Sequence, residues 1–147
     1  MQSELLTLSE PDYSEAVSVW ETSVRASHHF LSEADIQFYK PLILNDYLPA
    51  LSLFGIRHAS GKLAGFIGIA GPKIEMLFIH PDDFGKGVGK ILCRFAMQDL
   101  RASEVEVNED NPEALTFYTK MGFKVVGRSP VDPSGKPFPI LHLNAKA

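Results

Sequence analysis

A glycine-rich junction is the feature that most constrains how this chain can fold. In MLFIHPDDFGKGVGKILCRF, residues 76–95, three glycines alternate between an apolar run and a helix-like run. Alternating glycine is costly in regular structure, because glycine loses the most backbone freedom on folding. The stretch therefore predicts a strand that passes through a loop of close backbone approach into a helix over residues 88–100. The alternating run EVEVN, residues 104–108, completes a βαβ unit, which requires parallel strands and a right-handed crossover.

The segments around this unit predict helices before it and antiparallel strands on both sides of it. Residues 4–8 predict a first strand, and two helices follow. Asp12 suits the N-cap of the first helix, and Pro41 disturbs the middle of the second, which begins near Ser32. The further predicted strands cover residues 50–58, 62–70, 73–80, 123–131 and 137–144.

The clearest helix signal is NPEALTFYTKMG, residues 111–122. Asn111 suits the N-cap, Pro112 suits the first helical position, and Gly122 suits the position just beyond the end. The predicted order is thus β-α-α-β-β-β-α-β-α-β-β. This order indicates one α/β domain over residues 1–147, built on a mixed β-sheet.

Composition narrows the class of protein. A length of 147 residues, with 45% hydrophobic and 22% charged residues, is typical of one globular domain with a real core. The longest apolar stretch is too short to cross a bilayer, the first residues lack a signal-peptide pattern, and we expect no membrane association. The single Cys93 cannot form an internal disulfide, so we expect a cytoplasmic protein with an inert, buried thiol. The net charge of −4 argues against binding of nucleic acid.

The glycine loop is suited to hold a phosphate group. A strand that enters a helix through glycines directs several backbone N–H groups at one point, where the helix dipole adds positive potential. Lys86, Lys90 and Arg94 follow at intervals of four, so they share one face of the helix near that point. One alternative is a tight turn with solvated cations. Another is a nucleotide-binding domain of a different class, with Glu106 as the ribose partner. The spacing excludes a Walker A loop.

Two motifs together resemble those of the GNAT superfamily of N-acetyltransferases. FGKGVG, residues 84–89, resembles its acyl-CoA pyrophosphate loop Q/R-x-x-G-x-G/A, and NEDNPEALTFYTKMGF, residues 108–123, resembles N-x-x-A-x-x-F-Y-x-x-x-G-F. The resemblance implies a mixed sheet flanked by about four helices. It also implies direct transfer of an acetyl group from acetyl-CoA to a primary amine through a ternary complex, with no metal ion. A non-catalytic acyl-CoA-binding module is the alternative, to which Phe84 gives room, since the family usually has Arg or Gln there.

The resemblance also assigns roles to residues. The strand at residues 77–79 would pair with the pantetheine arm, the amides of residues 85–90 would hold the pyrophosphate, and Tyr118 would lie near the thioester sulfur. The cofactor-binding residues so implied are Leu77, Phe78, Ile79, Phe84, Gly85, Lys86, Gly87, Val88, Gly89, Lys90, Asn111, Phe117 and Lys120.

Acetyl transfer to an amine sets three chemical requirements. The amine must be neutral, although the reference pKa of lysine is about 10.4. The oxyanion needs N–H donors, and the leaving thiolate needs a proton, for which Tyr118 is the candidate. His28 and Glu75 are both candidates for the general base. The alternative is that Tyr118, His28 and Glu75 have only packing, capping or surface roles.

The sequence leaves the acceptor and the oligomeric state open. A small-molecule amine or a protein lysine would fit, and the protein is either a monomer or a homodimer. Three aromatic residues would either wall the acceptor site or belong to the core: Trp20, Tyr39 and Tyr47.

Overall fold

The computed structural model describes residues 3–146 and contains one seven-stranded mixed sheet. The strand order is β1-β2-β3-β4-β5-β7-β6, in which β4 and β5 are parallel and the other neighbours are antiparallel. This arrangement confirms the mixed sheet and the βαβ unit. The strands are β1 (Ser3–Leu8), β2 (Ser52–His58), β3 (Leu63–Ala70), β4 (Lys73–Ile79), β5 (Glu104–Asn108), β6 (Lys124–Ser129) and β7 (Ile140–Asn144).

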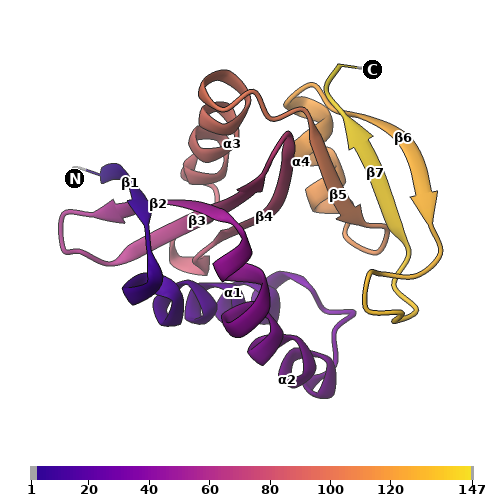
Figure 1. The fold of residues 1–147 in the computed structure, drawn as a ribbon, viewed down its shortest axis with the longest axis horizontal. Helices are drawn as coiled ribbons and strands as arrows, with labels where there is room; N and C mark the ends of the chain where they lie inside the picture. The colour runs from indigo at the N-terminus through magenta and orange to yellow at the C-terminus, as the bar shows by residue number, and fades with distance from the viewer. Residues whose placement is uncertain (1–2, 147) are drawn as a thin grey trace.

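Four α-helices cover the two faces of the sheet, as expected (Figure 1). The helices α1 and α2 pack on one face, and α3 and α4 pack on the other. No helix within residues 3–146 has the length and apolar character needed to cross a membrane. The helices are α1 (Tyr13–Ser27), α2 (Glu33–Leu42), α3 (Val88–Asp99) and α4 (Pro112–Lys120).

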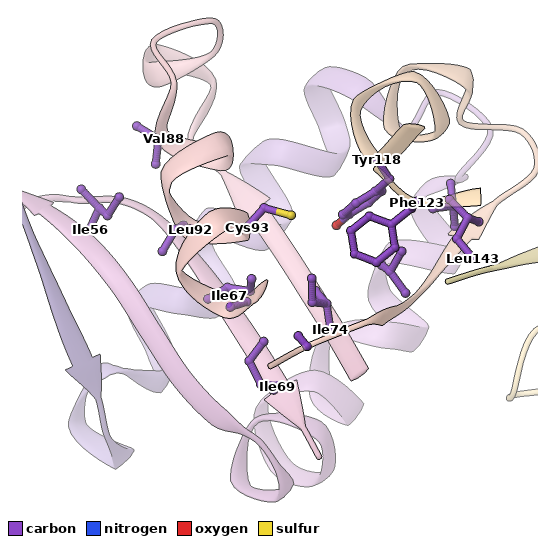
Figure 2. Packing of buried hydrophobic residues seen from close by; sticks show 14 of the residues in the cluster. Ile56, Ile67, Ile69, Ile74, Val88, Leu92, Cys93, Tyr118, Phe123 and Leu143 are labelled. Atoms are coloured by element: carbon purple, nitrogen blue, oxygen red, sulfur yellow. The ribbon is translucent and has the colours of Figure 1, made fainter. Parts of the chain in front are cut away.

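The buried strand β3 divides the core into two layers. Phe66 is fully buried on the side of α1 and α2, and Ile67 is fully buried on the side of α3. Side chains alternate between the two faces of a strand, so both layers are built from one apolar run. Figure 2 shows the second layer, where Leu92 and Cys93 of α3 meet Ile74 of β4.

The parallel strands β4 and β5 pair over only two positions. Lys73 pairs with Glu104 and Ile74 with Val105, and no further pairing joins these two strands in the described part of the chain. In Figure 1 they diverge beyond that point. The edge of β4 that faces β5 therefore leaves backbone groups free over residues 75–79, next to the glycine loop.

Local sequence signals account for most helix ends. Ser32 caps α2 by accepting a hydrogen bond from the Asp35 amide at 3.1 Å. Asp12 occupies the N-cap position of α1, but its side chain does not cap that helix. Its carboxylate instead accepts hydrogen bonds from the Ser9 amide at 2.8 Å and from Arg57 at 2.9 Å. The predicted N-cap position is therefore confirmed, but the Asp12 side chain is drawn away from the helix amides by Ser9 and by Arg57, which is far away in sequence.

The disturbance expected at Pro41 is confirmed, and it ends the helix. Proline has no N–H, so it removes one hydrogen bond of the helical ladder. The helix α2 stops at Leu42, one residue later, and a π-helical turn, η2 (Ile43–Tyr47), follows. The 3₁₀ turn η3 (Leu48–Ala50) then leads into β2. Two further 3₁₀ turns are η1 (Glu10–Asp12) and η4 (Pro81–Asp83).

Candidate active site

The glycine loop has the geometry that the sequence predicts. Gly85 and Gly87 have φ angles of 74° and 85°, in the left-handed region that side chains rarely adopt. A Cβ at either position would meet no heavy atom within 4 Å, so the loop is open to a ligand at these points. Gly87 is the N-cap of α3 and carries no side chain to cap it. The loop therefore presents an uncapped helix N-terminus.

Most amides of this loop are free of protein acceptors. The Lys86 amide donates to the Asp83 carbonyl at 3.3 Å, so it is occupied, contrary to the expectation that all amides of residues 85–90 would hold the ligand. Free helix N-terminal amides together with the helix dipole form an anion site. Within residues 3–146, the free amides are those of Gly85, Gly87, Val88, Gly89 and Lys90.

The loop meets β4 and α4 at one point. A Cβ on Gly89 would lie 3.7 Å from Ile79 at the end of β4 and 3.7 Å from the ring of Phe117 on α4. The free edge of β4, the start of α3 and the Phe117 ring thus converge. An extended ligand along β4 would have its anionic end at the loop amides, in the manner of strand addition.

A cationic cavity of about 360 Å³ continues from this point between α3 and α4. It brings together Lys90 and Lys120, both predicted, with Arg94, which the sequence places on the same helix face but the family motif does not include. Lys86 does not line it. Three cations beside a loop of free amides are suited to further phosphate groups. The lining residues are Lys90, Arg94, Met97, Gln98, Phe117, Lys120 and Met121.

The Phe84 side chain is not suited to bind phosphate. It is 44% exposed at the start of the loop, and its ring cannot donate a hydrogen bond to phosphate. The anion site of this chain therefore depends on the backbone and on the three cations, rather than on a side chain at position 84.

Tyr118, in the second motif, is buried in the core layer that contains α3 and α4. Its residue exposure is 7%, and its ring packs against Phe117 and Phe123 with centroid separations of 5.0 and 5.6 Å. In Figure 2 the hydroxyl points across to the Cys93 thiol of α3. The hydroxyl makes no hydrogen bond to any described residue, and burial raises the pKa of Tyr118 above its usual range. The phenol therefore keeps its proton and leaves it available to a ligand.

His28 connects the end of α1 to the start of α4. The Ala114 amide donates to Oδ1 of Asn111, so Nδ2 of Asn111 donates to Nε2 of His28 at 3.1 Å. The Ser27 hydroxyl bonds the Ser23 carbonyl, so Nδ1–H of His28 donates to Ser27 Oγ at 2.8 Å. Burial, with a smaller effect of the neighbouring histidine, lowers the pKa of His28 to about 4. Both ring nitrogens are engaged and the ring is neutral.

This network argues against His28 as the general base and gives Asn111 a second role. Asn111 is the N-cap of α4, as predicted, and it also orients His28, which no local signal shows. Because the lone pair of Nε2 is already engaged, His28 is poorly placed to take a proton from a substrate. The adjacent His29 is exposed.

A larger cavity, about 430 Å³, lies on the other side of β4 and β5. Its walls come from α1, α2, the turn η2 and the loop before β7, and its floor from β4 and β5. The three aromatic residues considered above all line it, as do both base candidates. The lining residues are Trp20, Val24, His28, Leu31, Tyr39, Ile43, Asp46, Tyr47, Ala50, Leu51, Glu75, Met76, Phe78, Glu106, Asn108, Asp132, Pro133, Ser134, Phe138 and Ile140.

Phe78 belongs to this cavity, whereas its neighbours Leu77 and Ile79 pack against the layer of α3. Side chains on a strand alternate, so β4 separates the larger cavity from the cationic groove. The larger cavity reaches β4 at Glu75, Met76 and Phe78, and the start of α3 meets the end of the same strand at Ile79. A ligand along β4 and a second ligand in the larger cavity would meet at this strand.

Carboxylates dominate the polar lining of the larger cavity. Nζ of Lys73 lies 2.9 Å from Oε1 of Glu106 and 3.3 Å from Oε1 of Glu75, and Nδ1 of His142 lies 2.8 Å from the other oxygen of Glu106. Glu106 therefore belongs to the cavity, and no geometry supports it as a ribose partner beside the glycine loop. The sequence missed it here because its two partners, Lys73 and His142, come from two other strands, β4 and β7.

Comparison with known proteins agrees with this architecture. The family model described as "Acetyltransferase (GNAT) domain" matches residues 36–137. The peptidyl-lysine N-acetyltransferase YjaB of Salmonella typhimurium is 41% identical over 86% of this chain and 87% of its own length. The enzyme of the same name from Escherichia coli is 40% identical over 88% of this chain and 87% of its own length.

Solved structures show the same fold. The solution structure of apo YjaB from Escherichia coli matches with a TM-score of 0.89 and 36% identity over 99% of this chain and 98% of its own. PaiA N-acetyltransferase from Thermoplasma acidophilum, crystallised with coenzyme A, matches with a TM-score of 0.71 and 25% identity over 97% and 98%. The chain therefore belongs to the GNAT family of acetyltransferases and is an N-acetyltransferase.

Proposed function

We propose that this enzyme transfers the acetyl group of acetyl-CoA directly to the side-chain amine of a protein lysine, with both substrates bound at once. Two observations support the pairing of substrates: the cationic groove and the larger cavity share no lining residue, and β4 lines the larger cavity while its end, Ile79, meets the start of α3 at Gly89. The relatives named as peptidyl-lysine N-acetyltransferases support a lysine acceptor. We keep the prediction of a single catalytic domain over residues 1–147, in the cytoplasm.

The groove fits coenzyme A. Its diphosphate suits the five free amides at the start of α3, and its further phosphate suits Lys90, Arg94 and Lys120. The pantetheine arm suits the free edge of β4 at residues 77–79. Three of the implied cofactor residues do not fit that role: the Phe84 ring cannot donate to phosphate, the Lys86 amide is already bonded, and both ends of the Asn111 amide are bonded. We therefore assign Asn111 a positioning role.

The observation that carries the lysine acceptor is the charge of the larger cavity. Four carboxylates line it, and neither Lys nor Arg does. The only imidazole there, that of His28, is neutral because burial lowers its pKa to about 4. A cavity lined by one sign of charge attracts a substrate of the opposite sign. A lysine ammonium at neutral pH has that charge.

Glu75 is the side chain best placed to take the proton of the amine. Both oxygens of Glu106 are occupied, by Lys73 and His142, whereas Glu75 has a single contact, at 3.3 Å to Lys73. Glu75 also stands on β4 and lines the larger cavity. We assign Glu75 as the general base and Glu106 as a fixed charge beside it.

Tyr118 supplies the second proton. The donor is a thioester, which yields its acetyl group to a neutral amine, so the bound ammonium first releases one proton to solvent. As the C–N bond forms and the C–S bond breaks, Glu75 receives the amine proton and Tyr118 gives its own to the sulfur. The raised pKa of Tyr118 keeps that proton in place until it is needed. Amides released by the divergence of β4 and β5 are suited to the developing oxyanion.

The test is release of thiol from acetyl-CoA in the presence of lysine peptides, with mass spectrometry of the product. We expect acetylation at the lysine side chain, and loss of about 10²-fold in turnover for Glu75→Gln. Glu106→Gln serves as the matched comparison, with a smaller loss of turnover and a raised KM for the peptide. Binding of acetyl-CoA without thiol release from any amine would instead show a non-catalytic module.

A further inference from the structure

The turn η2 places an acidic and an aromatic side chain next to each other at the larger cavity. Asp46 and Tyr47 are consecutive, both line the cavity, and both are exposed to solvent. Tyr47 is 37% exposed, which is high for a large aromatic residue beside a cavity with free space. Asp46 adds to the charge of the cavity, but neither residue takes part in the proton transfers assigned above.

Asp46 differs from the other three carboxylates of the cavity in having no partner. Asp132 accepts hydrogen bonds from the Tyr39 hydroxyl and from two amides of its own turn. Glu106 and Glu75 are held by Lys73, as described. Among the described residues, none donates a hydrogen bond to Asp46 or forms an ion pair with it. Its charge is therefore available to a substrate.

Asp46 and Tyr47 lie in a segment with an unusual backbone conformation. Pro41 ends the regular helix, and the chain continues through a π-helical turn, Ile43–Tyr47, before Pro49 opens the next turn. Ile43 and Leu48 are buried and anchor the two ends of this segment. Single π turns are rare and frequently found at functional sites. The turn is thus a fixed platform, not a free loop.

We propose that Asp46 and Tyr47 bind a second positively charged side chain, an Arg or Lys that flanks the target lysine in the acceptor protein. This inference rests on the proposed function and adds the class of sequence that the enzyme prefers. An exposed carboxylate attracts a cation, and an aromatic ring that lines the same cavity adds a second kind of side chain that contacts cations. The target lysine meets Glu75 and Glu106, so the flanking charge is left to meet Asp46, the carboxylate without a partner.

The experiment compares two peptides that differ only in the residues beside a single lysine, which are arginine in one and glycine in the other. For the unmodified enzyme we expect kcat/KM to be about ten-fold higher for the arginine-flanked peptide. Asp46→Asn should lower this preference about five-fold through KM, with kcat unchanged. Tyr47→Leu, which keeps an apolar side chain, should lower it about two-fold.

Glu10→Gln is the matched control, since Glu10 is an exposed carboxylate that lines neither cavity. It removes the same charge and should leave the preference intact. Equal rates for the two peptides, or equal losses for both in Asp46→Asn, would overturn the inference while leaving lysine acetylation established. If neither peptide is acetylated but small amines are, the proposed acceptor itself is wrong.

Discussion

Burial holds three reactive side chains around the site in their neutral forms. It raises the pKa of Tyr118 above its usual range, raises that of Cys93 to about 12 and lowers that of His28 to about 4. Burial disfavours the charged form of each group, which is why an acid and a base shift in opposite directions. Cys93 is therefore an inert thiol at neutral pH, as the sequence suggests. The charged groups of the larger cavity are carboxylates alone.

Replacing Tyr118 by phenylalanine removes only the hydroxyl group, so it tests the role of the phenolic proton. The ring packs against Phe117 and Phe123, while the hydroxyl bonds no described residue, so Tyr118→Phe should fold with stability within about 0.5 kcal/mol of the original. Turnover should fall about 10²-fold, the usual contribution of a positioned acid, with little change in KM for acetyl-CoA. Steady-state thiol release measures both quantities. Tyr13→Phe, outside both cavities, is the control. Unchanged turnover would remove Tyr118 from the mechanism.

His28 should make stability depend on pH. Its pKa is about 4 in the folded protein against a reference value near 6.5, so the unfolded chain takes up the proton first as pH falls. Stability conferred by the neutral ring is complete above about pH 6.5 and decreases toward pH 4. Between about pH 7 and about pH 5 we expect the original to lose about 2 kcal/mol more of its unfolding free energy than His28→Gln.

Urea unfolding at the two pH values measures this difference. His29→Gln, at the exposed neighbouring position, should behave like the original protein. Parallel losses in the original and in His28→Gln would show that the ring is solvated. The contact between His28 and Asn111 would then be weaker than the structure indicates.

At the scale of elements, the start of α3 combines two demands on one residue. Gly87 must adopt a positive φ, and it must leave its amide and those that follow free. Gly61, in the turn between β2 and β3, has a similar φ of 92° and an equally open Cβ position. The two glycines share the conformational demand, but only Gly87 belongs to the anion site.

Gly87→Ala and Gly61→Ala therefore separate strain from function. Each should cost about 1 kcal/mol of unfolding free energy, because alanine is strained at positive φ. Only Gly87→Ala should weaken binding of coenzyme A, about ten-fold, because relief of the strain turns an amide away from the diphosphate. Calorimetry gives both affinities. Equal affinity in the two variants would mean that the loop amides do not hold the cofactor.

Signals within a few residues predict the elements of this fold, while the details of the site depend on contacts between distant residues. The caps at Ser32 and Asn111 and the positive φ of Gly87 are visible in the sequence, since each depends on immediate neighbours. The contact of His28 with Asn111 spans 83 residues, and that of Tyr39 with Asp132 spans 93. Periodicity and spacing carry no information on such pairs. The motif match indicates the cofactor site, but only the structure places Glu106 in the larger cavity.

At the scale of the whole molecule, the main feature is the short pairing between β4 and β5, which we call the seam. The strands β1 to β4 and the strands β5 to β7 are joined in the sheet by two residue pairs, at Lys73 and Ile74. The His28–Asn111 contact, the Tyr39–Asp132 hydrogen bond and the Lys73–Glu106 ion pair also connect the two halves. A ligand that pairs with the free edge of β4 and also contacts α4 would add a further connection.

Coenzyme A should therefore stabilise the protein as a bridge across this seam. At a concentration of about 100 times its Kd, a ligand selective for the folded state adds about 2.7 kcal/mol, which for a chain of this size raises Tm by about 8 °C. We expect slower amide exchange over residues 75–79 and at the start of α3, and no effect of NAD. Exchange mass spectrometry with each ligand measures this. An equal rise in Tm with NAD would favour a nucleotide site, and protection confined to α3 would mean that β4 does not pair with the pantetheine arm.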